Sequence, residues 1–502
     1  MRLAEPLGRL PDGVAQPAYD RHALGRAIVH LGLGAFARAH LAAVNEAAIT
    51  ASGDLRWGIV GVSMRHPQVR DALAPQHGLY ALALRDADAD GHARETLQVI
   101  GCVRAVLVAP EDPRAVLERI ADPQTRIVSL TVTEKGYCHD PASGALRFDD
   151  VDIAHDLGHP ASPRSAIGFI AHGLHLRQQR GLAGVTLLSC DNLPSNGRTL
   201  RGLVGAFAGR LDPALAGWID TTCRFPNAMV DRIVPRTTEA DRTGISARLG
   251  LDDAAPVVAE PFLDWVIEDD FAAGRPAWQA GGARFVAQAL PHERMKLRML
   301  NGSHSTIAYL GGLAGLQTVH EVIGVADLRA FIDALMRCEI APTLPADAGL
   351  DADAYRLRLL ERFGNPSLGH RTRQIAMDGS QKLPQRLLGT ARDRLAAGLP
   401  IERIALAVAA WIRYLEGSDE HGNRHEIDDP LREVLALQLL AARSAADAHE
   451  DEAVERRRIA AFCTYAPVFG DLGADPRFID AVARQSTRLR QHGAVDAARR
   501  AT

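Results

Sequence analysis

Short apolar segments alternate with helix-like segments through the first half of the chain, and this alternation restricts the fold more than any other feature. Ile28–Leu31 is a short, mostly apolar run that ends in glycines, and a helical pattern follows over His40–Ile49. Similar runs recur at Trp57–Met64, Ala81–Asp86, Leu97–Val103, Arg126–Glu134 and Gly184–Asn192. Apolar strands separated by helices predict a parallel sheet that is covered on both faces.

The pattern changes near residue 285, beyond which long helical patterns dominate. Over Ile401–Gly417, for example, apolar residues recur every three or four positions, and the pattern stops at a glycine. We therefore predict two domains of different class. An α/β domain covers residues 1–285, and a mostly helical, all-α domain covers residues 286–502.

Charge and composition exclude several kinds of protein. The 57 Lys and Arg residues nearly balance the 61 Asp and Glu residues, so we expect no broad positive surface for nucleic acid. No apolar run reaches about 18 residues, and the first residues lack the apolar core of a signal peptide, so we expect a cytoplasmic protein with no membrane segment. The six cysteines stand singly and the histidines show no HExxH spacing, so we expect no metal site.

A pair of glycines, Gly32 and Gly34, follows the first apolar run and opens a helix. Glycines at this point let the backbone approach a pyrophosphate, so the context is that of a dinucleotide site. The third glycine of the GxGxxG pattern is replaced by Ala37. The alternative is an ordinary turn between a strand and a helix.

The second apolar run ends without the acidic residue that binds an adenosine ribose in many such sites. Arg65 stands there instead, where it is suited to a 2′-phosphate or to stacking on adenine. The choice between NAD and NADP therefore stays open on physical grounds.

Two further polar residues follow apolar runs, where ligands of parallel sheets bind. Asn192 is suited to donating a hydrogen bond to a substrate oxygen, and the alternative is an Asx turn that caps the next helix. Glu134 is either a site residue or a plain surface acid.

The densest polar cluster runs from Glu293 to His304. On a helix, Lys296, Asn301 and His304 would fall within about 140° of one face. A partly buried lysine can act as a base, and an amide can stabilise a developing alkoxide, so the set suits proton transfer to or from an alcohol. The alternative is a solvated lysine beside a helix kink.

A basic segment follows between residues 369 and 386. Its cations, Arg371, Arg373, Lys382 and Arg386, are suited to clamping a carboxylate. The alternative is a solvated basic helix.

The order of these motifs closely resembles the mannitol dehydrogenase family, the long-chain polyol-specific dehydrogenases. The resemblance covers nearly the whole chain and rests on the strings IVHLGLGAFARAH, TVTEKGY, SCDNLPSNG, FPNAMVDRIVP, MKLRMLNGSHS and RTRQIAMDGSQKLPQR. It implies a Rossmann-type NAD-binding domain followed by a helical substrate domain. The last two strings look more like the fructuronate reductases, which act on a sugar acid, than the mannitol 2-dehydrogenases, which act on a neutral polyol.

The resemblance also implies roles for individual residues. Lys296 matches the catalytic lysine, which gives a proton to the C5 carbonyl oxygen of fructuronate or removes it from mannonate. Asn192 and Asn301 match the amides that hold that oxygen, and His304 matches a substrate-binding histidine that orients the lysine. Glu293 matches a glutamate that exchanges protons with solvent.

Further matches concern binding. Asp231, Arg373 and Lys382 match substrate contacts. The dinucleotide turn is matched by Gly32, Gly34 and Phe36, whereas Ala37 stands where the family often has histidine. The implied cofactor is NAD, with NADP not excluded; no metal is implied, and the family is commonly monomeric or weakly dimeric. A nucleotide-binding regulator that has lost catalysis is the alternative of another class.

Overall fold

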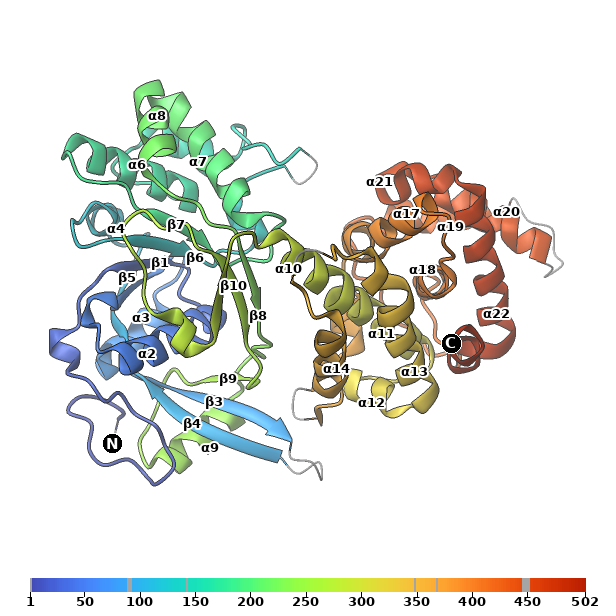
Figure 1. The fold of residues 1–502 in the computed structure, drawn as a ribbon, viewed down its shortest axis with the longest axis horizontal. Helices are drawn as coiled ribbons and strands as arrows, with labels where there is room; N and C mark the ends of the chain where they lie inside the picture. The colour runs from blue at the N-terminus through green and yellow to red at the C-terminus, as the bar shows by residue number, and fades with distance from the viewer. Residues whose placement is uncertain (1, 88–92, 141–142, 347–348, 367–368, 445–451) are drawn as a thin grey trace. The chain divides into compact units, whose positions relative to one another are not determined.

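The structure is a computed structural model that describes residues 2–87, 93–140, 143–346, 349–366, 369–444 and 452–502. It divides into two compact units after Glu293, whereas the sequence placed the boundary near residue 285. Figure 1 colours the first unit blue to green and the second yellow to red. Each unit is described by itself.

A five-stranded parallel sheet forms the centre of the first unit. Its order is β5 (Val103–Val108), β2 (Ile59–Ser63), β1 (Ile28–Leu31), β6 (Ile127–Leu130) and β7 (Thr186–Ser189). Every residue of the last four of these strands is buried. The order places β1 in the middle, with β2 on one side and β6 on the other, as in a Rossmann-type domain.

Both faces of this sheet are covered by helices, as the apolar strands predicted. Successive residues of β1 belong to different cores, because side chains alternate between the two faces of a strand. Ile28 packs into a core with α1 (Ala35–Ala39) and α2 (Leu41–Ser52). Val29 packs into a second core with helices from the other half of the unit, namely α4 (Pro113–Ile120), α6 (Ala166–Gln179) and α7 (Asn196–Leu211).

Two predicted strands do not join the parallel sheet. β3 (Tyr80–Ala87) and β4 (Ala93–Ile100) pair with each other in antiparallel fashion, and β9 (Val257–Ala259) adds to β3. The predicted strand Leu97–Val103 breaks after residue 100, because Glu46 Oε2 accepts the N–H groups of Gly101 and Cys102, both at 2.8 Å. After this break the chain continues as β5, which belongs to the five-stranded parallel sheet.

The remaining elements of the first unit surround these sheets. A third sheet has the order β11 (Ala283–Val286), β10 (Asp264–Glu268), β8 (Ala228–Asp231). Further α-helices of this unit are α3 (Gln68–Leu73), α5 (Val151–Gly158), α8 (Pro213–Thr222) and α9 (Glu239–Leu249). α10 (Leu290–Met295) spans the point in the chain where the units divide.

The described part of the second unit contains only helices, as predicted. Its α-helices are α11 (Gly302–Leu313), α12 (Val319–Gly324), α13 (Ala326–Ala334), α14 (Ala352–Phe363), α15 (Thr372–Ala376), α16 (Gly379–Leu383), α17 (Gly389–Ala396), α18 (Glu402–Tyr414), α19 (Arg432–Ser444), α20 (Glu452–Cys463), α21 (Ala466–Phe469) and α22 (Pro476–Ala501). α18 is buried along most of its length and packs against α11 and α22 (Figure 1).

Three π-helical turns interrupt this unit: η6 (Lys296–Asn301), η7 (Leu335–Ile340) and η10 (Pro384–Leu388). η6 contacts both η7 and η10. Such turns are rare and occur often at functional sites. Among the described helices of the whole chain, none is long and apolar enough to cross a membrane.

Candidate active site

A cavity of about 820 Å³ lies at the carboxyl ends of β1, β2 and β6 in the first unit. Its lining includes Gly32, Gly34, Arg65 and Thr131. Ligands of open parallel sheets bind at this edge. The cavity therefore lies at the glycine pair, where the sequence predicts a dinucleotide site.

The backbone at Gly32 requires glycine. Its φ angle is +90°, and a Cβ atom there would lie 2.1 Å from the carbonyl oxygen of Thr131. The next loop of the sheet can therefore approach the turn only because Gly32 has no side chain. Gly34 has a negative φ, and the nearest atom to a Cβ there would be 3.9 Å away, so local packing does not require glycine at this position. The absence of a side chain instead leaves the cavity open.

Two other residues of this turn point to the interior. Ala37, at the third glycine position, is 1% exposed and belongs to the core beside the sheet. Phe36 stacks on His40 with ring centroids 5.0 Å apart and packs against the same core. Arg65 is exposed at the cavity, and Glu134 is exposed between Thr133 and Lys135, which line it.

Asp191, in the loop after β7, forms hydrogen bonds with the loop after β6 at this edge of the sheet. Asp191 was not among the site residues predicted from the sequence. Its carboxylate accepts the N–H groups of Val132 at 3.0 Å and Thr133 at 3.1 Å, and the hydroxyl of Tyr137 at 2.8 Å. Thr133 has a φ of +65°, so these bonds hold a strained backbone at the cavity wall. Burial raises the pKa of Asp191. The available signal was its position, directly before Asn192 at the end of an apolar run.

Asn192 lies exposed on the turn after β7, and Glu293 holds that turn. Ser195, with a φ of +44°, is the N-cap residue of α7, and its N–H lies 3.1 Å from each carboxylate oxygen of Glu293. The side chain of Ser195 itself makes no capping hydrogen bond. Asp231 ends β8 and is buried, opposite Asp264 in the neighbouring strand.

The second unit brings Lys296, Asn301 and His304 to one side of a helix through a π-turn. In η6 the N–H of Gly302 bonds to the carbonyl of Leu297, five residues earlier. The extra residue per turn places Lys296 and Asn301 one turn apart, and His304 follows one α-helical turn later. Lys296 and His304 are only 7% and 8% exposed. This burial argues against the solvated-lysine alternative.

His304 has a basic environment. Its ring lies 4.8 Å from that of Phe363 and 5.2 Å from that of His370. Burial, together with His370, Arg362, Arg386 and Lys296, lowers the pKa of His304 well below its usual value. His304 is therefore a neutral imidazole near pH 7, able to accept and to donate one hydrogen bond.

Arg386 joins η10 to the helix that carries these residues. Its Nη1 donates to the Ser305 hydroxyl at 3.1 Å and to the Asn301 carbonyl at 3.4 Å. Burial lowers the pKa of Arg386 to about 10, so it remains charged at neutral pH. A Cβ at Gly302 would lie 2.9 Å from the Arg386 carbonyl, so this glycine permits the close approach of the two backbones.

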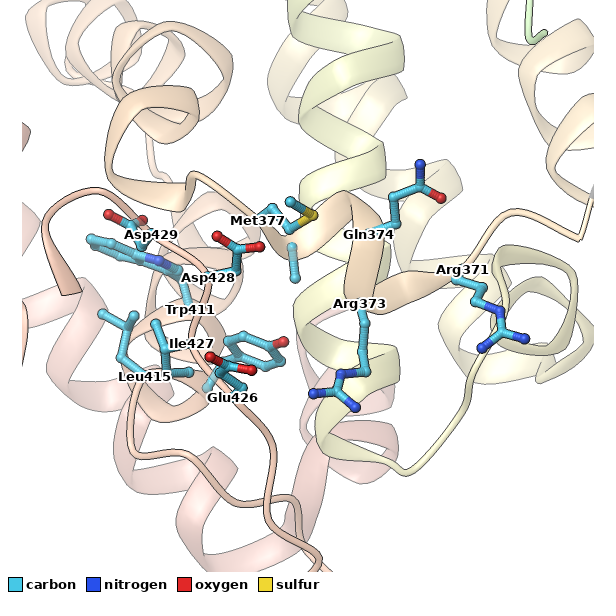
Figure 2. Close-up of a pocket in the computed structure, with 12 residues that line it drawn as sticks. Arg371, Arg373, Gln374, Met377, Trp411, Leu415, Glu426, Ile427, Asp428 and Asp429 are labelled. Carbon is cyan, nitrogen blue, oxygen red and sulfur yellow. The ribbon is translucent and has the colours of Figure 1, made fainter. Parts of the chain in front are cut away.

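The other basic residues of the segment lie differently. Lys382 donates to the Met377 carbonyl at 2.6 Å, and burial lowers its pKa. Arg371 and Arg373 are exposed and line a cavity of about 360 Å³, whose wall includes Trp411. Figure 2 shows the side chains of Arg373 and Gln374 pointing to opposite sides of α15. None of the described residues that line this cavity belongs to the Lys296, Asn301 and His304 set.

Comparison with known proteins shows the family. The model for the mannitol dehydrogenase Rossmann domain matches residues 26–280, and the model for the mannitol dehydrogenase C-terminal domain matches residues 288–490. The chain is 46% identical to the D-mannonate oxidoreductase of Escherichia coli over 83% of this chain and 86% of that one. It is 38% identical to the mannitol 2-dehydrogenase of Pyricularia oryzae over 98% and 96%.

A solved structure agrees with these relatives. The Pseudomonas fluorescens mannitol 2-dehydrogenase, in a ternary complex with NAD and D-mannitol, is 37% identical and matches with a TM-score of 0.83 over 100% of this chain and 99% of that one. The chain belongs to the mannitol dehydrogenase family. It is thus an oxidoreductase of that family, with a Rossmann domain and a helical C-terminal domain.

Proposed function

We propose that the chain is an NAD-dependent oxidoreductase that interconverts D-fructuronate and D-mannonate. The observation that carries the proposal is the burial of Lys296 and His304 among further basic side chains, an environment suited to an anionic substrate. The 46% identity to a D-mannonate oxidoreductase supports it.

The cavity at Gly32 suits the dinucleotide, because the two glycines of the turn expose backbone without side chains at the carboxyl ends of the strands. When bound, NADH supplies the hydride that reduces the substrate carbonyl carbon. The first unit is thus proposed to hold the cofactor. NADP stays open, because the exposed Arg65 at the cavity is suited to a 2′-phosphate.

Lys296 manages the proton in this proposal. Its ammonium form donates a proton to the carbonyl oxygen as the hydride arrives, and its neutral form removes the hydroxyl proton in the reverse direction. Asn301 is suited to donating a hydrogen bond to the same oxygen, and neutral His304 to holding a substrate hydroxyl. By resemblance, Asn192, Asp231 and Glu293 are proposed to act in the same reaction.

A second candidate function is mannitol 2-dehydrogenase activity, which produces fructose from mannitol. It is favoured by the similarity over the full chain to mannitol 2-dehydrogenases, including one solved with NAD and D-mannitol. The difference between the two substrates that matters to the protein is a carboxylate in place of a hydroxymethyl group.

A substrate panel separates these functions. Fructuronate, tagaturonate, fructose and mannitol are tested with both coenzymes while the absorbance at 340 nm is followed. We expect the highest kcat/KM with fructuronate and NADH. A higher kcat/KM with fructose or mannitol would replace the proposal by the second candidate. Binding of NADH without turnover of any substrate would favour a non-catalytic regulator.

A further inference from the structure

A cavity of about 340 Å³ lies in the second unit, at the end of α11 that is farther from His304. Its lining includes Gly312 on α11 and Arg424 in the loop after α18, and we call it the Arg424 cavity. Because an α-helix rises 1.5 Å per residue, Gly312 lies about 12 Å along α11 from His304. None of the described residues that line the Arg424 cavity belongs to the Lys296, Asn301 and His304 set.

Three exposed arginines line this cavity, namely Arg371, Arg373 and Arg424. Within the described part of the chain, their guanidinium groups form no hydrogen bond and no ion pair. Other exposed arginines of the second unit are paired; Arg392, for example, lies 2.6 Å from a carboxylate oxygen of Asp471. Three guanidinium groups that keep their donors free around one cavity are suited to an anion.

The backbone that carries two of these arginines is held in place. Thr372 stands between Arg371 and Arg373, and its N–H donates to the Gln317 carbonyl at 2.9 Å. The Thr372 hydroxyl donates to the Leu316 carbonyl at 3.0 Å. The two arginines therefore extend from a fixed backbone on the wall of the cavity.

The loop that carries Arg424 is held by Asp419, the acidic residue among the described residues that line the Arg424 cavity. One carboxylate oxygen of Asp419 accepts the N–H groups of His421 at 2.9 Å and Asn423 at 2.8 Å, and the other accepts the Asn423 side-chain amide at 2.9 Å. Ser418 forms a β-bridge with Arg424. Because the Asp419 carboxylate is used inside its own loop, it leaves the three guanidinium groups unneutralised.

A neighbouring cavity has a different charge. The cavity of about 360 Å³ described above shares Arg371 and Arg373 with the Arg424 cavity, but three acidic residues line it as well: Glu426, Asp428 and Asp429. These three acids do not line the Arg424 cavity. The excess of positive charge is therefore on the Arg424 side.

The chemistry of the lining favours a phosphate group. A phosphate monoester carries about −1.5 to −2 charges at pH 7, which matches several guanidinium groups better than a single carboxylate does. Tyr414 adds an aromatic wall, stacked on His425 with ring centroids 4.1 Å apart. The volume is at the lower end of the range for small-molecule sites, so it leaves room for a short carbon skeleton beside the phosphate.

We propose that Arg371, Arg373 and Arg424 bind the phosphate group of a small phosphorylated molecule at a site separate from the Lys296 site. The inference goes beyond the proposed function and does not rest on it. It gives Arg371 and Arg373 a different ligand from the substrate carboxylate that the sequence led us to expect.

The test is a calorimetric titration of the full chain with inorganic phosphate and with D-glucose 6-phosphate. NADH is kept saturating so that the dinucleotide cavity is filled, and ionic strength is kept constant because salt screens exposed charges. We expect both phosphates to bind and D-glucose not to bind. Arg424→Gln and Arg371→Gln should each raise the Kd about 10- to 100-fold, as for loss of a charge-assisted hydrogen bond.

Arg329→Gln is the matched control, because it removes an exposed arginine of α13 that does not line the Arg424 cavity. It should leave the Kd unchanged. Melting temperatures show whether each variant is folded, and Arg371→Gln carries the test if Arg424→Gln is not.

Other outcomes are equally decisive. Tighter binding of D-glucose 6-phosphate than of inorganic phosphate identifies an ester as the ligand, and binding of inorganic phosphate alone identifies the free ion. No binding of either phosphate, or the same Kd in wild type and in both cavity variants, would overturn the proposal. Displacement of phosphate by saturating D-mannonate would assign the cavity to the substrate and overturn it as well. Because the titration involves no turnover, failure of the proposed function would leave its result unchanged.

Discussion

Both carboxylate oxygens of Glu293 lie 3.1 Å from the backbone nitrogen of Ser195. Ser195 has a φ of +44°, a conformation that a serine adopts only when its surroundings hold it. The same turn carries Asn192. Glu293 is thus an anchor for this turn, a role distinct from the proton exchange implied by the family resemblance.

Variants of Glu293 separate the two roles. Glu293→Gln keeps an oxygen that accepts the Ser195 N–H but cannot take up a proton, whereas Glu293→Ala removes the bond. We expect Glu293→Ala to lose about 1–2 kcal/mol of unfolding free energy and Glu293→Gln to lose much less. If anchoring is the whole role, Glu293→Gln also keeps its kcat. A kcat that falls in Glu293→Gln at unchanged stability would instead assign proton exchange, and the pH dependence of kcat would then change.

The glycine turn yields a prediction about cofactor binding. In Gly32→Ala the new Cβ would lie 2.1 Å from the Thr131 carbonyl oxygen, so the wall of the cavity must move. We expect at least a tenfold weaker NADH affinity, measured by fluorescence titration. Gly13→Ala is the matched control, because Gly13 has a similar φ of +85° with no atom within 4 Å of the added Cβ. A similar loss of affinity in both variants would contradict the argument.

The sequence predicts the parts of the fold that depend on local pattern. Buried strands such as Ile28–Leu31 are mostly apolar runs, and the residues that follow them mark the edge of the sheet where the cavity lies. The break at Gly101 was not predictable, because it depends on Glu46, which is 55 residues away in sequence. The antiparallel pairing of β3 with β4 likewise depends on long-range contacts that no local pattern encodes.

In the candidate site too, the sequence predicts what local spacing determines and does not predict what depends on long-range contacts. A helical wheel placed Lys296, Asn301 and His304 within about 140° of one face, but it did not predict the π-turn between Lys296 and Asn301, which contacts η10. Arginine content predicted a basic segment between residues 369 and 386. It did not predict which arginines face His304, because neighbouring residues such as Arg373 and Gln374 point to opposite sides of a short helix (Figure 2).

Lys296 gives the most direct prediction about activity. Lys296→Ala should lower kcat about 10²- to 10⁴-fold, the usual contribution of a positioned acid or base, and leave NADH affinity unchanged. Lys296→Arg keeps the positive charge but does not lose its proton near neutral pH. We therefore expect Lys296→Arg to fail in mannonate oxidation, measured as NADH formation at 340 nm. Turnover near the wild-type rate in Lys296→Ala would reject the assignment.

His30 gives a prediction about stability and pH. Its ring is fully buried in β1, with Nδ1 2.8 Å from the Ser129 hydroxyl and Nε2 2.9 Å from the Thr131 hydroxyl. Thr131 donates its own proton to the Gly32 carbonyl at 2.7 Å, so its oxygen accepts from Nε2–H of His30. Burial lowers the pKa of His30 to about 4.

The sign of the pH effect follows from that shift. Above pH 6.5 the ring is neutral in both the folded and the unfolded chain, so its full stabilisation is present. As the pH falls from 6.5 towards 4, only the unfolded chain binds the proton, and the folded chain loses up to about 3 kcal/mol through this one group. His30→Gln removes the titration, and other buried histidines contribute equally to both proteins. The difference in unfolding free energy between wild type and His30→Gln, measured in urea, should therefore shrink by about 2 kcal/mol between pH 7.5 and pH 5. A difference that stays constant over this range would show that His30 titrates alike in the folded and unfolded chains, contrary to its burial beside the glycine turn.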